Sequence, residues 1–459
     1  MELKFGIMND TIIALTTPFG RSGIAVLRLS GMRSLEIIAK LTFDEDFKLT
    51  PRQVVLKKIY DIETKEVVDE AIITYFQSPQ SFTGEDVVEI SCHGSPVLIR
   101  QIIDFCLRLG ARIAEAGEFS LRALYNGRMN LSQAEAIRDL IEAQTVASSR
   151  QAIRQLRGEL SNTLQPLKDN LLDIIVVLES TLEFVEDDLP AFQMKNLKKK
   201  LTETANKLGE IASTFSAGRL LREGLKVTLA GRPNVGKSSL FNVLIGQERA
   251  IVTEIAGTTR DSLQETLCIK GIPVSLNDTA GLRETFDTIE SIGVIRTKQK
   301  MADSDLVIVV LDGSQNLTDD DKKLLYDLQD VNYVIAINKS DIRKTEINFD
   351  ELPNQKKFVK TSAKTKLGLD KLQDTIIKPF LPRDLADDGF LVSDARHFDL
   401  LNRAKSEIEM SCSFIDERKS EEIVLIGLHN AMRFLGEITG ETTTEDMLTR
   451  IFSTFCIGK

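Results

Sequence analysis

Short apolar runs alternate with turn-rich stretches over the first 120 residues. Because they are rich in β-branched and aromatic residues, they predict strands at Ile12–Leu15, Ile24–Leu29, Val54–Tyr60, Glu70–Phe76 and Val87–Ser91. Apolar residues at helical spacing predict one helix over Pro96–Leu109, which ends at Gly110. This mixture indicates an α+β domain at 1–120.

A helical period replaces this pattern from Leu121 onward. It continues through two long stretches that end near Pro190 and Ile211. At Leu225 the pattern changes to alternating strands and helices, and after Leu381 the helical period returns. Since an inserted domain is tolerated where its two ends lie close together, the helical segments read as one interrupted domain.

The predicted fold class is therefore multidomain, combining α/β and all-α parts. The α+β domain at 1–120 is followed by a discontinuous helical domain at 121–222 and 382–459. An α/β domain at 223–381 is inserted into it. The length of 459 residues agrees, since it favours about three domains.

Composition excludes several classes of protein. Hydrophobic residues make up 42% and charged residues 27%, which is ordinary for globular domains. The net charge of −10 disfavours nucleic-acid binding through bulk electrostatics, although a local basic patch stays open. The most apolar stretch, Leu171–Leu178, contains Asp173, so no membrane span is predicted. The N-terminus shows no secretory signal.

The cysteines and histidines point away from a metal or disulfide framework. The five cysteines include no CxxC pair, and an odd count with this spacing favours a reducing, cytoplasmic location. The three histidines are scattered, which argues against a histidine-based catalytic centre.

The strongest chemical signal is GRPNVGKSS at 231–239. It has the GxxxxGK[ST] pattern, follows the apolar strand Lys226–Ala230 and precedes a helical pattern. Backbone N–H groups of such a loop surround phosphates, and the helix N-terminus adds a favourable dipole. We expect Lys237 to reach the β- and γ-phosphates and the Ser238 hydroxyl to bind Mg²⁺.

Two further segments indicate that the base is guanine, and a third completes the site for Mg²⁺ and the γ-phosphate. In NKSD at 338–341, the carboxylate of Asp341 can accept hydrogen bonds from guanine N1–H and N2, which adenine lacks, a difference worth ~10⁴-fold in selectivity. TSAK at 361–364 fits a second base-contacting loop. In DTAG at 278–281, Asp278 can hold Mg²⁺ through water and the Gly281 N–H can sense the γ-phosphate. These motifs predict a Ras-like P-loop GTPase domain.

Two departures concern hydrolysis. Leu282 stands where small signalling GTPases place a water-orienting Gln, so the catalytic device must come from elsewhere. The effector segment at 253–261 offers hydroxyls and carbonyls but no clear arginine finger beyond Arg260. The predicted GTP-binding residues are Asn234, Val235, Gly236, Lys237, Ser238, Ser239, Thr253, Glu254, Ile255, Ala256, Gly257, Thr258, Thr259, Asp278, Thr279, Ala280, Gly281, Asn338, Lys339, Asp341, Ser362, Ala363 and Lys364.

Motifs outside the GTPase segment identify a family resemblance over essentially the full length. They are DTIIALTTPFGRSGIAVLRLSG, SFTGEDVVEISCHGSP, GEFSLRALYNGRMNLSQAEAIRDLI and the terminal FCIGK. With them the chain resembles the MnmE (TrmE) family of tRNA modification GTPases. These motifs are more specific than the G motifs, which many GTPases share.

The resemblance implies a function and partners. Such proteins act with an FAD-dependent partner of the MnmG (GidA) type, in a heterotetramer, on C5 of the wobble uridine of certain tRNAs. They add a carboxymethylaminomethyl or aminomethyl group from a tetrahydrofolate donor, 5-formyl or 5,10-methylene. The N-terminal domain binds the folate and forms a homodimer, and the G domains pair in a potassium-dependent way. Which tRNAs are modified, and whether ammonium or glycine gives the nitrogen, stays open.

The resemblance also implies site residues. Folate contacts fall on Arg28, Glu89, Arg128 and Lys459, with Arg128 standing where a Lys is common. Mg²⁺ falls on Ser238 and Thr259, and K⁺ on Asn234, Thr253, Ile255 and Thr258. The water-orienting carboxylate falls on Glu290, so the catalytic set is Glu290, Lys237 and Asp278.

Three alternatives remain at this point. Cys456 is either a buried packing residue, the favoured interpretation, or a thiol beside the folate. Lys195, Lys198, Lys199 and Lys200 form either a solvated helix face or a contact for tRNA or partner. Two rival functions also remain beside tRNA modification. One is a GTP-dependent RNA-binding or ribosome-assembly factor without tRNA-modifying chemistry, and the other is a pure nucleotide switch. Folate binding distinguishes these three functions.

Overall fold

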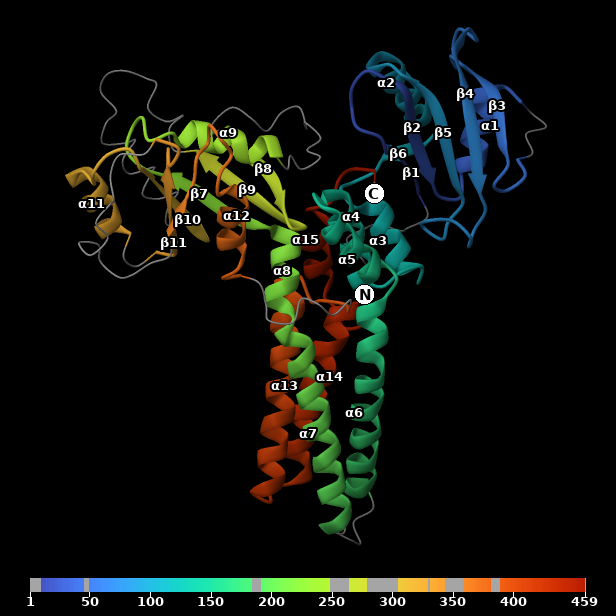
Figure 1. Ribbon diagram of the computed structural model, residues 1–459. Helices are drawn as coiled ribbons and strands as arrows, with labels where there is room; N and C mark the ends of the chain where they lie inside the picture. Colours follow the sequence, from blue (N-terminus) through green and yellow to red (C-terminus); the bar gives the residue numbers. More distant parts are fainter. Residues whose placement is uncertain are drawn as a thin grey trace, which may run out of the picture. The chain divides into compact units, whose positions relative to one another are not determined.

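The computed structural model describes residues 10–44, 49–183, 191–247, 264–278, 304–328, 331–342, 358–380 and 389–458. The chain divides into two compact units. The first unit comprises residues 1–138 with 436–459, and the second unit comprises residues 139–435 (Figure 1). The predicted domain boundaries at 120, 222 and 381 stay predictions.

A six-stranded sheet forms the main layer of the first unit, in the order β3-β4-β5-β2-β1-β6. Its strands are β1 (Thr11–Leu15), β2 (Ser22–Ser30), β3 (Val54–Tyr60), β4 (Val67–Phe76), β5 (Val87–Gly94) and β6 (Ala111–Ile113). All neighbours are antiparallel except β1 and β6. The five predicted strands are confirmed, while β6 and helix α1 were not predicted.

Two helices cover one face of this sheet, α1 (Ser34–Thr42) and α2 (Pro96–Arg108). Alternate strand residues such as Leu27, Ile73 and Ile90 point toward them and form the buried core. The intervening residues face the other side, where Ile24, Leu56 and Ile72 are exposed. The sheet therefore has one face covered by the two helices. The other, which we call the open face, is exposed over β3 and β4, whereas near β1 its Ile12 and Ala14 pack with Phe119.

Three helical elements complete the first unit. They are α3 (Glu118–Tyr125), the first part of α4 (Leu131–Glu142) and α15 (Glu445–Phe452). Apolar side chains of α3, α4 and α15, including Leu121, Leu131 and Phe452, form one small core. The C-terminal residues thus pack with the N-terminal part of the chain.

A helix bundle forms part of the second unit. Its long helices are α6 (Glu159–Glu183), α7 (Ala191–Ser213), α13 (Ala395–Asp416) and α14 (Glu421–Thr439), which continues past the unit boundary (Figure 1). Two shorter helices are α5 (Val146–Leu156) and α8 (Phe215–Glu223). The predicted helical period is confirmed, but Arg157 and Gly158 separate α5 from α6. Among the described residues no helix has the length and hydropathy of a membrane span.

The second unit also contains the predicted α/β domain. Its sheet has the order β12-β11-β10-β7-β9-β8, parallel except for β8. The strands are β7 (Leu225–Ala230), β8 (Gln264–Ile269), β9 (Ile272–Asp278), β10 (Leu306–Asp312), β11 (Tyr333–Asn338) and β12 (Phe358–Lys360). The helices are α9 (Lys237–Gln247), α11 (Asp319–Asp327) and α12 (Leu369–Ile377). Its central strands are apolar on both sides, as buried parallel sheets are.

Candidate functional site

The phosphate-binding loop lies between β7 and α9, at the carboxyl edge of the sheet. Its glycine at 236 has a φ of 93°, and a Cβ there would lie 2.3 Å from Asn338 Nδ2. Asn234 also has a positive φ of 63°. A side chain at 236 would therefore collide with Asn338, and the positive φ values turn the backbone as phosphate-binding loops require.

Lys237 begins α9 and is almost fully buried. Its Nζ donates to the carbonyl oxygens of Gly231, at 2.9 Å, and of Arg232, at 2.8 Å. The amine is therefore held inside the loop by groups that phosphate oxygens can replace. Ser238 and Ser239 follow at the exposed N-terminal end of the helix, where the helix dipole favours anions.

Asn338 and Lys339 connect the base-recognition segment to the phosphate loop. The Asn338 side chain donates to the Val235 carbonyl, at 3.0 Å, and accepts from the Ala363 N–H, at 3.0 Å. Lys339 Nζ donates to the Asn234 carbonyl, at 2.8 Å, and to Asp312 Oδ2, at 2.6 Å. Sequence reasoning missed Asp312, although the register pairs it with Asn338 at the end of β10.

Asp312 is the buried counter-ion of this connection. Burial raises the pKa of its carboxyl, but hydrogen bonds from Lys339 and Ser314 outweigh burial and hold the pKa at about 2. The carboxylate therefore stays ionised and keeps Lys339 in place.

Asp341 presents its carboxylate at the surface of the same segment. Its Oδ1 accepts from the Ser362 hydroxyl at 2.7 Å, and this hydrogen bond lowers the pKa of Asp341. Ser362 is itself buried, and its Oγ accepts from the Thr365 N–H at 3.1 Å. The carboxylate that the sequence assigns to guanine is thus ionised and oriented before any ligand arrives, beside Ala363 and Lys364.

Several predicted residues lie outside the described part of the chain. They are Thr253, Glu254, Ile255, Ala256, Gly257, Thr258, Thr259, Thr279, Ala280, Gly281, Leu282 and Glu290, and the side chain of Asp278 at the end of β9. Of the predicted metal ligands, Ser238 and Asn234 are described. Both are exposed at the loop and carry the oxygen ligands that Mg²⁺ and K⁺ need.

Arg28 and Glu89 lie side by side on the open face of the N-terminal sheet. They are register partners on β2 and β5, and Arg28 Nε and Nη2 donate to Glu89 Oε1 at 3.0 and 2.8 Å. The guanidinium carbon lies 5.2 Å from the Phe82 ring centre and 5.7 Å from that of Phe119. Sequence reasoning missed both aromatic rings.

Arg128 approaches the same place through the loop that carries Phe82. Its Nε donates to the Ser81 carbonyl at 3.1 Å. Lys459 lies outside the described residues, but the residues just before it are described. Ile457 forms an isolated bridge with Ala116, and a Cβ on Gly458 would lie 2.4 Å from the Leu15 carbonyl.

Cys456 is exposed, so the favoured prediction that it packs in an apolar interior is wrong. The apolar side chains of this terminus that are buried are Phe452 and Phe455. The backbone carbonyl of Cys456 accepts from the Gly117 N–H at 3.4 Å. Pairing through the backbone leaves the thiol outside the core.

The lysine cluster of α7 is partly neutralised. Lys198 pairs with Asp416 of α13, and Lys199 lies 3.9 Å from Glu203 of its own helix. Exposed pairs of this kind indicate a solvated helix face rather than a focused positive patch.

An unforeseen cluster of buried charges lies beside the Arg28 region. Arg122 of α3 is 2% exposed and pairs with Asp10, Glu85 and Glu118. Arg112 pairs with Asp10 and Glu118 as well. In the GEFSLRAL motif, the spacing of four between Glu118 and Arg122 indicates a shared helix face, but it does not indicate burial.

Two family models together match most of the chain. A family model of the MnmE helical domain matches residues 131–456, and a model of the GTP-binding protein TrmE N-terminus matches residues 11–128. Among solved structures, the G domain of the T. maritima FeoB iron transporter is 29% identical. The match covers 34% of this chain and 97% of the FeoB domain, with a TM-score of 0.27.

Full-length relatives are also similar. The tRNA modification GTPase MnmE of Aquifex aeolicus (strain VF5) is 41% identical over 453 residues, covering 98% of this chain and 100% of the relative. The tRNA modification GTPase MnmE of Koribacter versatilis (strain Ellin345) is 40% identical over 456 residues, with coverage of 98% and 100%. The chain therefore belongs to the MnmE (TrmE) family of tRNA modification GTPases.

Proposed function

We propose that this GTPase acts with an FAD-dependent partner of the MnmG (GidA) type to modify C5 of the wobble uridine in certain tRNAs. The added group is a carboxymethylaminomethyl or aminomethyl group, whose one-carbon unit comes from a tetrahydrofolate derivative. The assembly is a heterotetramer that works in the cytoplasm. GTP hydrolysis, with Mg²⁺ on Ser238 and Thr259, drives the cycle.

The observation that carries the folate proposal is the placement of the C-terminal residues. Gly458 lies against Leu15 of β1, and the preceding residue of that strand, Ala14, is the register partner of Arg28. Gly458, the residue before the proposed folate contact Lys459, therefore lies against the strand that pairs with Arg28. A cation, a paired carboxylate and aromatic rings suit a ligand with both a conjugated ring and acidic groups.

The open face of the N-terminal sheet supports the proposed homodimer. Ile24 and Leu56 are each 65% exposed and Ile72 is 41% exposed, and Leu56 and Ile72 are register partners. An apolar sheet face of this kind is characteristic of an interaction surface. Burial of this face in a dimer would also shield the Arg28 region from water.

The potassium proposal concerns hydrolysis. With Leu282 unable to orient water, a cation near the β–γ bridge supplies the positive charge that an arginine finger gives elsewhere. Asn234, whose side chain is exposed at the phosphate loop, would hold K⁺ with Thr253, Ile255 and Thr258, and Glu290 would orient the water. Hydrolysis should therefore be faster in potassium than in sodium at equal ionic strength, and Asn234→Ala should remove most of the difference.

Reduced-folate binding tests the function directly. The full chain should bind 5-formyl-tetrahydrofolate in equilibrium dialysis, and Arg28→Gln, Glu89→Gln and a variant lacking Lys459 should each bind it more weakly. Lys195→Gln, on the exposed face of α7, is the matched surface control. Wild-type protein that hydrolyses GTP but binds no folate would contradict the proposal and favour the ribosome-assembly alternative.

A further inference from the structure

The junction between the helix bundle and the GTPase domain is short and closely packed. Helix α8 ends at Glu223 and strand β7 begins at Leu225, so Gly224 alone connects them. Gly224 has a φ of 74°, and a Cβ there would lie 2.4 Å from the Pro273 carbonyl of β9. Two neighbouring strands of the GTPase sheet therefore start at this point.

The same two strands lead to the nucleotide site. Strands β7 and β9 are parallel, and their register runs from Leu225 opposite Val274 to Leu229 opposite Asp278. β7 ends at the phosphate loop, and β9 ends at Asp278, the start of the DTAG motif. Each of the two strands therefore connects the nucleotide end of the sheet directly to the junction.

Helix α8 belongs to the GTPase core as well as to the bundle. Its Leu220 and Leu221 join the buried cluster that contains Leu225, Val274 and Leu276. Ala147 of α5 and Leu391 pack against the same cluster. Because cores are close-packed, α8 cannot shift independently of the sheet.

Arg222, in the last turn of α8, ties three separate segments together. Its Nε donates to Asp139 Oδ1 of α4 at 3.0 Å, and its Nη1 donates to Asp394 Oδ2 at 2.7 Å. The Asp139 side chain is 7% exposed, that of Asp394 14% and that of Arg222 20%. The three side chains form what we call the Arg222 clamp.

Asp394 connects the clamp to the returning chain. Its Oδ1 accepts from the Arg396 N–H at 2.8 Å and caps the N-terminus of α13, the helix that continues into the bundle. Gln151 of α5 holds the segment before it, since its side chain bonds to Gly389 and Leu391. The chain therefore leaves the bundle after α8 and returns to it at α13, and Arg222 contacts the chain at both points.

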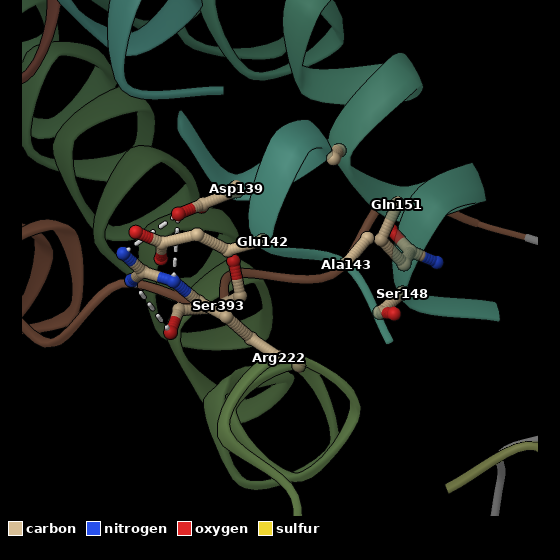
Figure 2. Close-up of a pocket in the computed structure, with 9 residues that line it drawn as sticks. Asp139, Glu142, Ala143, Ser148, Gln151, Arg222 and Ser393 are labelled. Atoms are coloured by element: carbon tan, nitrogen blue, oxygen red, sulfur yellow. Dashed lines mark hydrogen bonds and ion pairs between the residues drawn. The ribbon is translucent and has the colours of Figure 1, made fainter. Parts of the chain in front are cut away.

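A small cavity beside the clamp leaves space for its side chains to rearrange. Figure 2 shows Arg222 between Asp139 and Ser393, with Glu142, Ser148 and Gln151 on the other walls. Its volume is about 40 Å³, space for about three water molecules. Glu142, one turn beyond Asp139 on α4, places a second carboxylate on the same cavity.

We propose that Arg222 is a positioning residue that couples the nucleotide state of the GTPase domain to tRNA modification. Movement of β7 and β9 shifts α8, and the bidentate guanidinium passes that shift to α4 through Asp139 and to α13 through Asp394. This role rests on the proposed partner-dependent tRNA modification, but not on the potassium or dimerisation proposals.

The test compares two activities in the same variants of the full chain. Arg222→Gln and Asp394→Asn should hydrolyse GTP nearly as wild type does, because neither residue lies at the nucleotide site. The amount of tRNA modified per GTP hydrolysed, measured by nucleoside analysis with the partner present, should fall by about 5- to 150-fold, the usual range of coupling between sites. Asp394→Asn retains the helix cap, so its effect reports the ion pair.

Two further variants separate coupling from charge and from general stability. Arg222→Lys keeps the charge but lacks the planar guanidinium that reaches two carboxylates. The amount of tRNA modified per GTP hydrolysed should therefore be reduced as in Arg222→Gln. Arg219→Gln removes an equal charge from an exposed pair on the same helix, Arg219–Glu223, and the ratio should stay at the wild-type value.

Hydrogen exchange gives a second measurement if Arg222→Gln folds poorly. In wild type, amide protection over 389–400 should differ between GDP and a non-hydrolysable GTP analogue, and in Asp139→Asn this difference should be reduced. An unchanged modification-to-hydrolysis ratio in Arg222→Gln and Asp394→Asn, or a nucleotide-dependent difference that Asp139→Asn retains in full, would overturn the proposal.

Discussion

Each unit of the molecule buries an arginine among carboxylates, but the surroundings differ. Arg122 in the first unit is 2% exposed and meets three carboxylates, with Arg112 sharing two of them. Arg222 in the second unit is 20% exposed, meets two carboxylates and borders a cavity of about 40 Å³. The almost complete burial of Arg122 favours one arrangement of its side chain, while the space beside Arg222 allows a second.

The comparison separates two uses of a buried ion pair. Around Arg122, Asp10 precedes β1, Glu85 lies in the loop that carries Phe82, and Glu118 begins α3. The cluster therefore fixes the backbone on which the Arg28 region is built. The Arg222 clamp instead ties together segments that the nucleotide state is proposed to shift.

The largest expected effect is loss of the Arg122 cluster. Arg122→Met leaves three carboxylates with a single arginine between them, so the first unit should lose about 3–5 kcal/mol of stability. Hydrogen exchange of β1 and α3 amides in the full chain, followed against urea, measures this change. GTP hydrolysis should persist, and a loss below about 1 kcal/mol would show that the cluster is not a structural centre.

Arg222→Gln should cost less, about 1–3 kcal/mol in the second unit. A glutamine amide keeps one hydrogen bond, and the adjacent cavity lets water reach Asp139 and Asp394. Hydrogen exchange followed against urea, on peptides from α8 and α13, measures this loss of stability. A larger loss of stability in the Arg222 variant than in the Arg122 variant would contradict the view that the Arg122 cluster fixes the backbone while the Arg222 clamp can rearrange.

The pH dependence of the Arg122 effect should follow from its carboxylates. Burial raises the pKa of Asp10 and of Glu118, but hydrogen bonds from Arg112 and the charge of Arg122 outweigh burial and leave both pKa values lowered. A lowered folded-state pKa stabilises the protein above the unfolded pKa, and this contribution is lost as pH falls.

The stability difference between wild type and Arg122→Met should therefore be largest at neutral pH and narrow below about pH 5. Each pKa unit of lowering corresponds to about 1.4 kcal/mol. Urea midpoints of both proteins measured from pH 7 to pH 3 give the comparison. A gap that widens on acidification would contradict the assignment of the charges.

The smallest effect should come from exposed ion pairs. Arg219→Gln and Lys270→Gln break pairs whose side chains are about half exposed or more, so each should change stability by about 0.5 kcal/mol or less. Thermal unfolding of the full chain is sufficient for this control. A cost equal to that of Arg222→Gln would show that burial does not explain the difference between the clusters.

Local patterns predicted most of the fold and the nucleotide loops. Enrichment in β-branched and aromatic residues predicted β3 at its observed bounds. The phosphate loop was predictable because all its residues are contiguous. Asp312 was missed because its role depends on the register between β10 and β11, which no single segment reveals.

The buried clusters were not predictable for the same reason. Arg222 lies 83 positions from Asp139 and 172 from Asp394, so their contact exists only after the bundle has formed. The spacing of four between Glu118 and Arg122 is that of neighbours on a helix face, but the burial of Arg122 depends on Asp10 and Glu85, which come from other segments. Cys456 was misjudged because apolar neighbours suggested burial, while the backbone of the terminus pairs with the segment at 116–117.

The central claim is that nucleotide hydrolysis at the site containing Asp341 powers tRNA modification. Asp341→Asn replaces an acceptor with an amide and should shift the site from guanosine to xanthosine nucleotides. We expect this variant to modify tRNA poorly with GTP and to recover when xanthosine triphosphate is supplied, whereas wild type shows the opposite preference. An Asp341→Asn protein that modifies tRNA at the wild-type rate with GTP, or that hydrolyses xanthosine triphosphate without modifying tRNA, would contradict the account.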